Sequence, residues 1–172
     1  MESYNLVYQR ECIEFLTVAK EFVSFLENAR QMNKRNFIDH SVKILPFLYL
    51  KASILHEINE FDDDFSEKFV VEEEWDFIMR TTSSILEGDD DYVQLDDIGF
   101  TSSMDSLSVT LSEIFADLYQ EIADLVGAYK TTNDGVILAA LANCQSNFKE
   151  YWGIRLLSLL KRLHEIKYCA ND

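Results

Sequence analysis

Apolar side chains recur every three or four residues along most of this chain, and that spacing limits what the chain can fold into. The clearest run covers residues 107–129 in six steps, about 3.7 residues per step, which is close to the α-helical period. Its members are Leu107, Leu111, Ile114, Leu118, Ile122, Leu125 and Tyr129. Tyr92–Leu95 alternates enough for a few extended residues, but too briefly to predict a sheet. The pattern therefore predicts an all-α protein.

The same spacing predicts five principal helices. They cover approximately residues 3–32, 37–59, 72–86, 107–129 and 134–166, with Ser3, Asn36 and either Ser103 or Ser106 as candidate N-caps. Residues 60–103 contain the least regular part of the pattern. With one Pro and five Gly in 172 residues, no linker divides the chain, and its length suffices for one sizeable core. We predict a single-domain helical bundle over residues 1–172.

Two positions within the predicted helices are unusual. Residues 44–50, ILPFLYL, are apolar on every side, which predicts a central helix that is buried all round. Pro46 removes a backbone hydrogen bond there, so we expect a kink rather than a break. Gly153 lies within the last predicted helix and costs about 1 kcal/mol relative to alanine. Close approach of another helix beside Trp152 would explain it.

Charge is the second constraint. The chain has 31 acidic residues against 15 Lys and Arg, a formal net charge of −16. Such a chain repels phosphate backbones and anionic headgroups, so we expect neither nucleic acid nor a membrane surface as a partner. The charge is concentrated, because residues 57–97 contain sixteen acids opposed by Lys68 and Arg80 alone. The rest of the chain is nearly neutral.

This acidic segment has three interpretations. Solvation of the surface is the commonest role of such runs, docking of a basic protein partner comes second, and mimicry of nucleic acid third. Among functional roles, the sequence favours a non-enzymatic binding protein with an acidic contact surface. The candidate contact residues are Asp62, Asp63, Asp64, Glu72, Glu73, Asp89, Asp90 and Asp91.

An alternative function uses carboxylates from neighbouring helices as metal ligands. Glu57 and Glu60 form an ExxE motif, and Glu121 and Asp124 form an ExxD motif. Paired motifs of this kind hold Mg²⁺ in all-helical nucleotide pyrophosphatases, because hard cations take several oxygen ligands. The alternative is thus a divalent-cation-dependent hydrolase of a phosphorylated small molecule. The same spacing also fits a solvated helix face, and no Lys or Arg completes a phosphate clamp.

The segment beginning at Asp62 also resembles a calcium-binding loop. Asp62, Asp64 and Ser66 take its first, third and fifth positions, and Glu73 takes the twelfth. The sixth position requires Gly for a sharp turn and is Glu67 here, which weighs against a specific calcium site.

Other chemical signals are sparse. The histidines His40, His56 and His164 have no metal-binding spacing, and no nucleophile or phosphate-loop motif is present, so we expect no cofactor and name no catalytic residue. The N-terminus lacks a signal-peptide pattern. The cysteines Cys12, Cys144 and Cys169 are odd in number and far apart, and the first two fall on apolar helix faces. These features are typical of a reduced cytoplasmic protein.

Three segments carry a resemblance to a known family. They are EFLTVAKEFVSFLENA (14–29), KILPFLYLKASIL (43–55) and NFKEYWGIRLLSLLKRLHEIKY (147–168). Together they resemble a bacterial family catalogued as domain of unknown function 5063, over nearly the full length. The resemblance implies a small, all-helical, cytoplasmic protein and carries over no functional residues.

Overall fold

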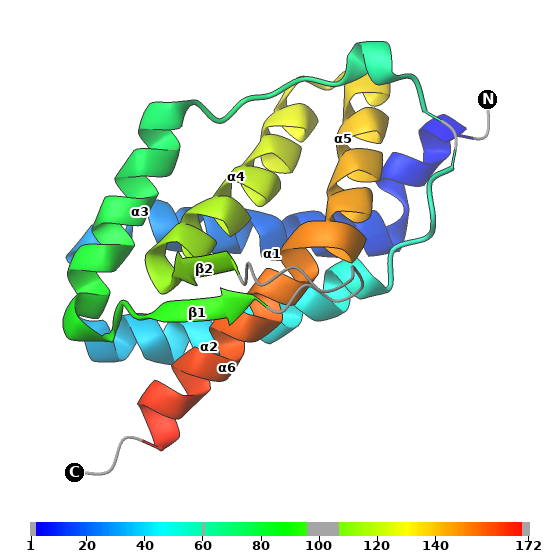
Figure 1. Cartoon of the computed structure of the whole chain (residues 1–172). Coiled ribbons are helices and arrows are strands. Elements are labelled where there is room, and N and C mark those ends of the chain that lie inside the picture. Colours follow the sequence, from blue (N-terminus) through cyan, green and yellow to red (C-terminus); the bar gives the residue numbers. More distant parts are fainter. Residues whose placement is uncertain (1–2, 60, 96–106, 170–172) are drawn as a thin grey trace.

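The computed structural model describes residues 3–59, 61–95 and 107–169 (Figure 1). Within them, six α-helices and one pair of short strands form a single domain, which confirms the predicted all-α class. The elements are α1 Arg10–Glu27, α2 Lys34–Ser53, α3 Glu72–Leu86, β1 Tyr92–Leu95, β2 Leu107–Thr110, α4 Leu111–Lys130, α5 Asp134–Asn147 and α6 Gly153–Tyr168. None of the helices in the described ranges is long and apolar enough to cross a bilayer.

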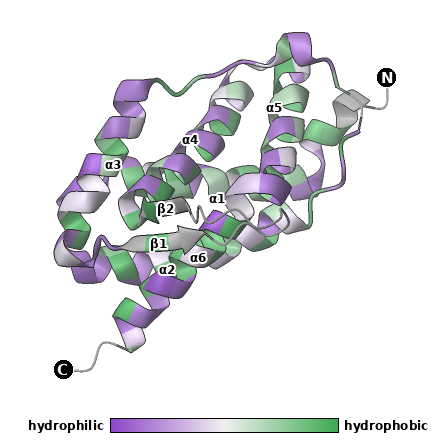
Figure 2. Ribbon diagram, in the orientation of Figure 1, coloured by the Kyte–Doolittle hydropathy of each residue, from purple (hydrophilic) through white to green (hydrophobic). Residues whose placement is uncertain are grey.

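The core lies between the described helices, all six of which contribute buried apolar side chains to it. Its largest fully buried side chains include Phe15, Phe22, Phe37, Phe115 and Trp152. Cys12 and Cys144 are buried in the same core, as their places on apolar faces predict. Figure 2 shows hydrophobic and hydrophilic residues alternating along each helix, the pattern of helices with one face on a core.

Several helix ends differ from the prediction, and side-chain caps account for the starts of α2 and α4. The first predicted helix is a 3-10 segment, Ser3–Tyr8, followed by α1. Helix α2 begins at Lys34 because the Asn33 side chain, not that of Asn36, accepts a hydrogen bond, from the Asn36 amide at 2.9 Å. Thr110 and Glu113 form a capping box that starts α4. The candidate caps Ser103 and Ser106 lie outside the described residues.

The prediction that residues 44–50 are buried on every side is wrong. Phe47 and Leu50 are 58% and 51% exposed, because α2 packs on α1 and α6 with one face only. Pro46 lies inside α2, which continues through it. The kink at Pro46 stays a prediction.

The last predicted helix is two helices joined by a π turn, Phe148–Trp152, and α5 and α6 leave it in different directions (Figure 1). Gly153 closes this turn, since its amide donates to the Phe148 carbonyl. A Cβ at position 153 would lie 2.5 Å from that carbonyl oxygen. The glycine is therefore explained by the backbone of the π turn and not by another helix.

The strands β1 and β2 pair antiparallel, with Tyr92 opposite Thr110 and Leu95 opposite Leu107. The sequence indicates the extended residues of β1 but not their partner, because Leu107 continues the apolar period of α4. The ladder is a small addition to the bundle, beside α6 and the start of α4.

Candidate functional site

Residues 55–59 and 61–71, here called the strap, lie between α2 and α3 across one end of the bundle. In Figure 1 the strap runs along the upper edge, over the last turns of α4 and the first turns of α5. Its one regular piece in the described residues is a 3-10 turn, Asp63–Phe65, which Figure 2 shows as hydrophilic. The strap contains the exposed residues Asp62, Asp63 and Asp64, so its attachment to the bundle decides how these carboxylates are presented.

Gln145 on α5 holds the first part of the strap. Its side chain is 7% exposed. The Nε2 atom donates to the carbonyls of Leu55 and His56 at 3.2 and 2.9 Å, and Oε1 accepts from the Ile58 amide at 3.0 Å. These contacts satisfy backbone groups that a longer α2 would pair within the helix, which accounts for the end of α2 at Ser53 rather than near residue 59.

Asp124 on α4 holds the last part of the strap and is also 7% exposed. Its Oδ1 accepts from the amides of Phe69 and Val70 at 2.7 and 2.9 Å, and its Oδ2 lies 3.2 Å from the Lys68 Nζ. Gly127, one turn further along α4, leaves space for the Phe69 ring, because a Cβ there would lie 2.6 Å from the ring. The strap is thus docked by polar and apolar contacts together.

The acidic residues predicted as one contact surface fall at two ends of α3. Asp62, Asp63 and Asp64 are exposed on the strap, and Glu72 and Glu73 are exposed in the first turn of α3. Residues 89–91 follow the other end of α3, whose 15 residues span about 22 Å. The structure therefore does not bring all eight together.

The residues at the far end, Asp89–Asp91, are engaged with other elements. Asp89 pairs with Lys34 of α2, and Asp91 pairs with Arg162 of α6. Asp90 accepts from the amide and hydroxyl of Ser112 at 2.8 and 2.7 Å, at the start of α4. These carboxylates tie the chain after α3 to three helices, which leaves the strap end as the exposed acidic surface.

The described residues of the alternative metal site each contact a different neighbour. Glu57 pairs with Lys149 at 2.5 Å, Glu121 accepts from Asn147 at 2.8 Å, and Asp124 holds the strap. Glu60 lies outside the described residues. In the parts of the chain that the structure describes, no three His, Cys, Asp or Glu side chains gather as a metal site.

The calcium-loop residues do not form a loop around a common centre. Asp62 caps the short 3-10 turn by accepting from the Asp64 amide at 3.0 Å, and Ser66 accepts from Asn143 at 2.9 Å. Glu73 belongs to α3. Glu67 at the position that requires Gly is consistent with this arrangement.

A polar cluster that the sequence does not indicate joins α3, α4 and α6 around Asp117. Its carboxylate accepts from the Trp75 Nε1 at 3.1 Å, the Tyr151 hydroxyl at 3.0 Å and the buried Arg155 at 3.0 Å. Burial, with Asp117 nearby, raises the pKa of Tyr151 to about 12. Arg155 also lies 4.2 Å from the Tyr151 ring centre. Because its donors and acceptors satisfy each other, the cluster is a structural joint.

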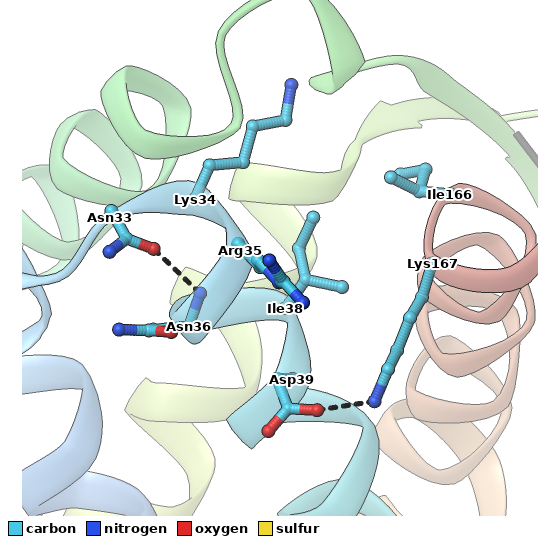
Figure 3. A pocket seen from close by; sticks show the side chains of 8 residues that line it. All are labelled: Asn33, Lys34, Arg35, Asn36, Ile38, Asp39, Ile166 and Lys167. Carbon is cyan, nitrogen blue, oxygen red and sulfur yellow. Dashed lines mark hydrogen bonds and ion pairs between the residues drawn. The ribbon is translucent and has the colours of Figure 1, made fainter. Parts of the chain in front are cut away.

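A hollow of about 920 Å³ lies between the start of α2 and the end of α6 (Figure 3). Lys34, Arg35 and Lys167 line it. Figure 3 shows Lys167 directed at Asp39, 2.5 Å away, whereas Lys34 points away from Asp39. Hydrogen bonds from Lys167 and Lys43 lower the pKa of Asp39 to about 2. Lys34 is paired with Asp89, and Lys167 is paired with Asp39. Arg35, the third cation that lines the hollow, forms no ion pair with another described residue.

Glu121 on α4 has a partly buried carboxyl group, and the pH dependence of stability tests this burial. Burial raises the pKa of its carboxyl, and Asp124 and Asp117 add to the shift, so the charged form is disfavoured in the folded state. Stability therefore falls as the pH rises from the ordinary glutamate pKa of 4.5 through the raised value. We expect Glu121→Gln, which keeps an acceptor for Asn147, to be more stable than the wild type near neutral pH.

Urea denaturation of both proteins between about pH 4 and about pH 8 measures this difference. It is expected to become small at the acidic end, where Glu121 is mostly protonated in both states. A difference that stays constant over the whole range would contradict the burial of an ionisable carboxyl at this position.

The fold and the docked strap define a small helical-bundle protein that carries an acidic loop on one end. A family model described as "Domain of unknown function (DUF5063)" matches residues 6–169, and the chain belongs to this family. The resemblance noted in the sequence is thereby confirmed.

A solved structure is similar over nearly the whole length. The crystal structure of protein BF1032 from Bacteroides fragilis has 35% sequence identity and a TM-score of 0.86, and the match covers 97% of this chain and 98% of that one. No protein with a curated description matches the chain. These findings support the fold and the family, and the family description names no activity.

Proposed function

We propose that the chain is a non-enzymatic binding protein whose strap docks a basic protein partner. The observation that carries the proposal is the run from Phe61 to Phe65. Its three aspartates are exposed and have no ion pair among the described residues, and the two flanking rings are 37% and 40% exposed. Exposed aromatic side chains beside unpaired charge are typical of protein contact surfaces.

The strap's attachment supports the same role. An acidic run that only solvates a surface needs no fixed backbone, whereas this one is held by Gln145 and Asp124 on two helices. A fixed surface loses less conformational entropy on binding than a free loop does. The alternative, a divalent-cation-dependent hydrolase, has no comparable support, because Glu57, Glu121 and Asp124 are each engaged by a different neighbour.

Affinity capture with a charge-matched pair of variants tests the proposal. Asp63→Asn/Asp64→Asn removes two exposed charges and keeps the capping Asp62. Glu21→Gln/Glu150→Gln removes two exposed charges from α1 and the π turn. In lysate of a bacterium that encodes this family, we expect the strap variant to lose a basic protein that the wild type and the control retain. Equal recovery by all three proteins would contradict the proposal.

A further inference from the structure

One stretch of α3 interrupts the acidic part of the chain. Residues 57–97 contain sixteen acids, but residues 77–86 contain none, and the one charged side chain among them is Arg80. Helix α3 lies at an edge of the molecule (Figure 1) and packs against the 3-10 turn Ala29–Gln31, which follows α1. This packing brings Arg30, from the turn, beside the part of α3 that has no carboxylate.

A hollow of about 290 Å³ lies between this turn and α3, and we call it the arginine hollow. The described residues that line it include no carboxylate. They are Arg30, Phe77, Arg80, Thr81, Ser84 and Ile85. The volume is at the small end of the range for ligand pockets, and apolar side chains beside a few polar groups are the usual composition of such pockets.

Both arginines of the hollow can donate to a ligand. Arg30 forms no ion pair with another described residue. Arg80 pairs with Asp76, one turn back on α3, through Nη2 alone at 3.1 Å, and its side chain is 75% exposed. A pair this exposed contributes little, and a guanidinium has five N–H donors, so Arg80 retains donors for a second anion.

Two hydroxyls add donors to the same side of the hollow. Thr81 and Ser84 are three residues apart and therefore lie on one face of α3. The neighbouring Thr82 hydroxyl is used within the helix, because it donates to the carbonyls of Ile78 and Met79. The Thr81 and Ser84 hydroxyls form no hydrogen bond with another described residue.

These donors select the chemistry of the occupant. Two positive charges and several N–H and O–H groups match a phosphate monoester, which carries a charge of about −1.5 to −2 near pH 7 and three acceptor oxygens. A carboxylate supplies less charge and fewer oxygens. The Phe77 ring, 42% exposed, and Ile85 lie in the same hollow and match the organic part of an ester.

We propose that the arginine hollow binds a small phosphate monoester, with Arg30 and Arg80 on the phosphate and Phe77 against the organic group. Exposed charges more than about 8 Å apart are largely screened at physiological salt, so a ligand in the hollow responds mainly to the residues around it and less to the net −16. The site contains no residue of the strap and is independent of the proposed function.

Titration of the isotope-labelled full chain with phenyl phosphate, followed by NMR, tests the proposal. We expect saturable shifts of the Arg30 and Arg80 Nε–H signals, and weaker binding of inorganic phosphate, which lacks the ring. Arg30→Gln and Arg80→Gln are each expected to weaken the binding of phenyl phosphate roughly ten- to hundredfold, the effect of losing a charge-assisted hydrogen bond. Phe77→Ala is expected to weaken it to the level of inorganic phosphate.

Arg10→Gln is the matched control, because Arg10 is also exposed and pairs with Glu14 one turn along its own helix. This variant and Asp63→Asn/Asp64→Asn should bind phenyl phosphate as the wild type does. A wild type without saturable binding would overturn the proposal, as would an equal loss of affinity in the Arg10 variant. Inorganic phosphate that binds as tightly as phenyl phosphate would overturn the assignment to an ester.

Discussion

Replacing Trp152 with alanine is expected to lower the free energy of unfolding by about 3–5 kcal/mol. Trp152 is fully buried where the π turn meets α6, and its ring centre lies 4.7 Å from that of Phe148. Its Nε1 donates to the Cys144 carbonyl at 2.9 Å. Truncation leaves a cavity in the core and removes the side-chain donor to that carbonyl at the same time.

Trp152→Phe separates the two contributions. Phenylalanine keeps much of the ring volume and loses the hydrogen bond, so we expect a smaller loss, about 1–3 kcal/mol. Denaturant unfolding followed by circular dichroism measures both variants. A cost below about 1 kcal/mol for the alanine variant would contradict the packing described for this turn.

Replacing Asp124 with alanine should release the strap while the bundle stays folded. The substitution removes the acceptor of the Phe69 and Val70 amides and the ion-pair partner of Lys68. Loss of partners for buried amides costs about 1–3 kcal/mol. Here the strap can detach into water, so the loss appears as local opening and not as global unfolding.

Limited trypsin digestion measures this opening, because Lys68 is a cleavage site within the docked segment. We expect cleavage after Lys68 to accelerate roughly ten- to hundredfold, since each ~1.4 kcal/mol lost raises the open population tenfold. Asp124→Asn keeps one acceptor oxygen and should fall between alanine and the wild type. Unchanged cleavage in the alanine variant would show that Asp124 does not hold the strap.

The sequence predicts the end of a helix correctly where neighbouring residues determine it, and not where a contact with a distant residue does. Helix α3 has the predicted bounds, 72–86, because acids crowd its first turn and the apolar period stops where it ends. Helix α2 was predicted to run to about residue 59, because its apolar period continues into the strap. Its true end depends on Gln145, almost 90 residues later, and local spacing contains no information about such a contact.

The candidate site shows the same difference between features that neighbouring residues determine and features that distant residues determine. The acidity of residues 62–64 and their exposure follow from the sequence. The engagement of residues 89–91 does not, because Lys34, Ser112 and Arg162 come from three distant segments. The sequence predicts Asp124 as a metal ligand or as part of a solvated helix face, whereas it is buried under the strap. The available signal was Gly127 within a helix, where a missing side chain indicates close approach of another segment.

Amide hydrogen exchange at Phe69 and Val70 tests most directly whether the strap is a docked surface and not a loose tether. Both amides donate to the buried Asp124 carboxylate. We predict that both are protected in the wild type, and that Asp124→Ala removes their protection while amides within α4 keep theirs. Exchange of these two amides in the wild type at the rate of an unstructured peptide would contradict the docked strap, and with it the fixed acidic surface on which the proposed function rests.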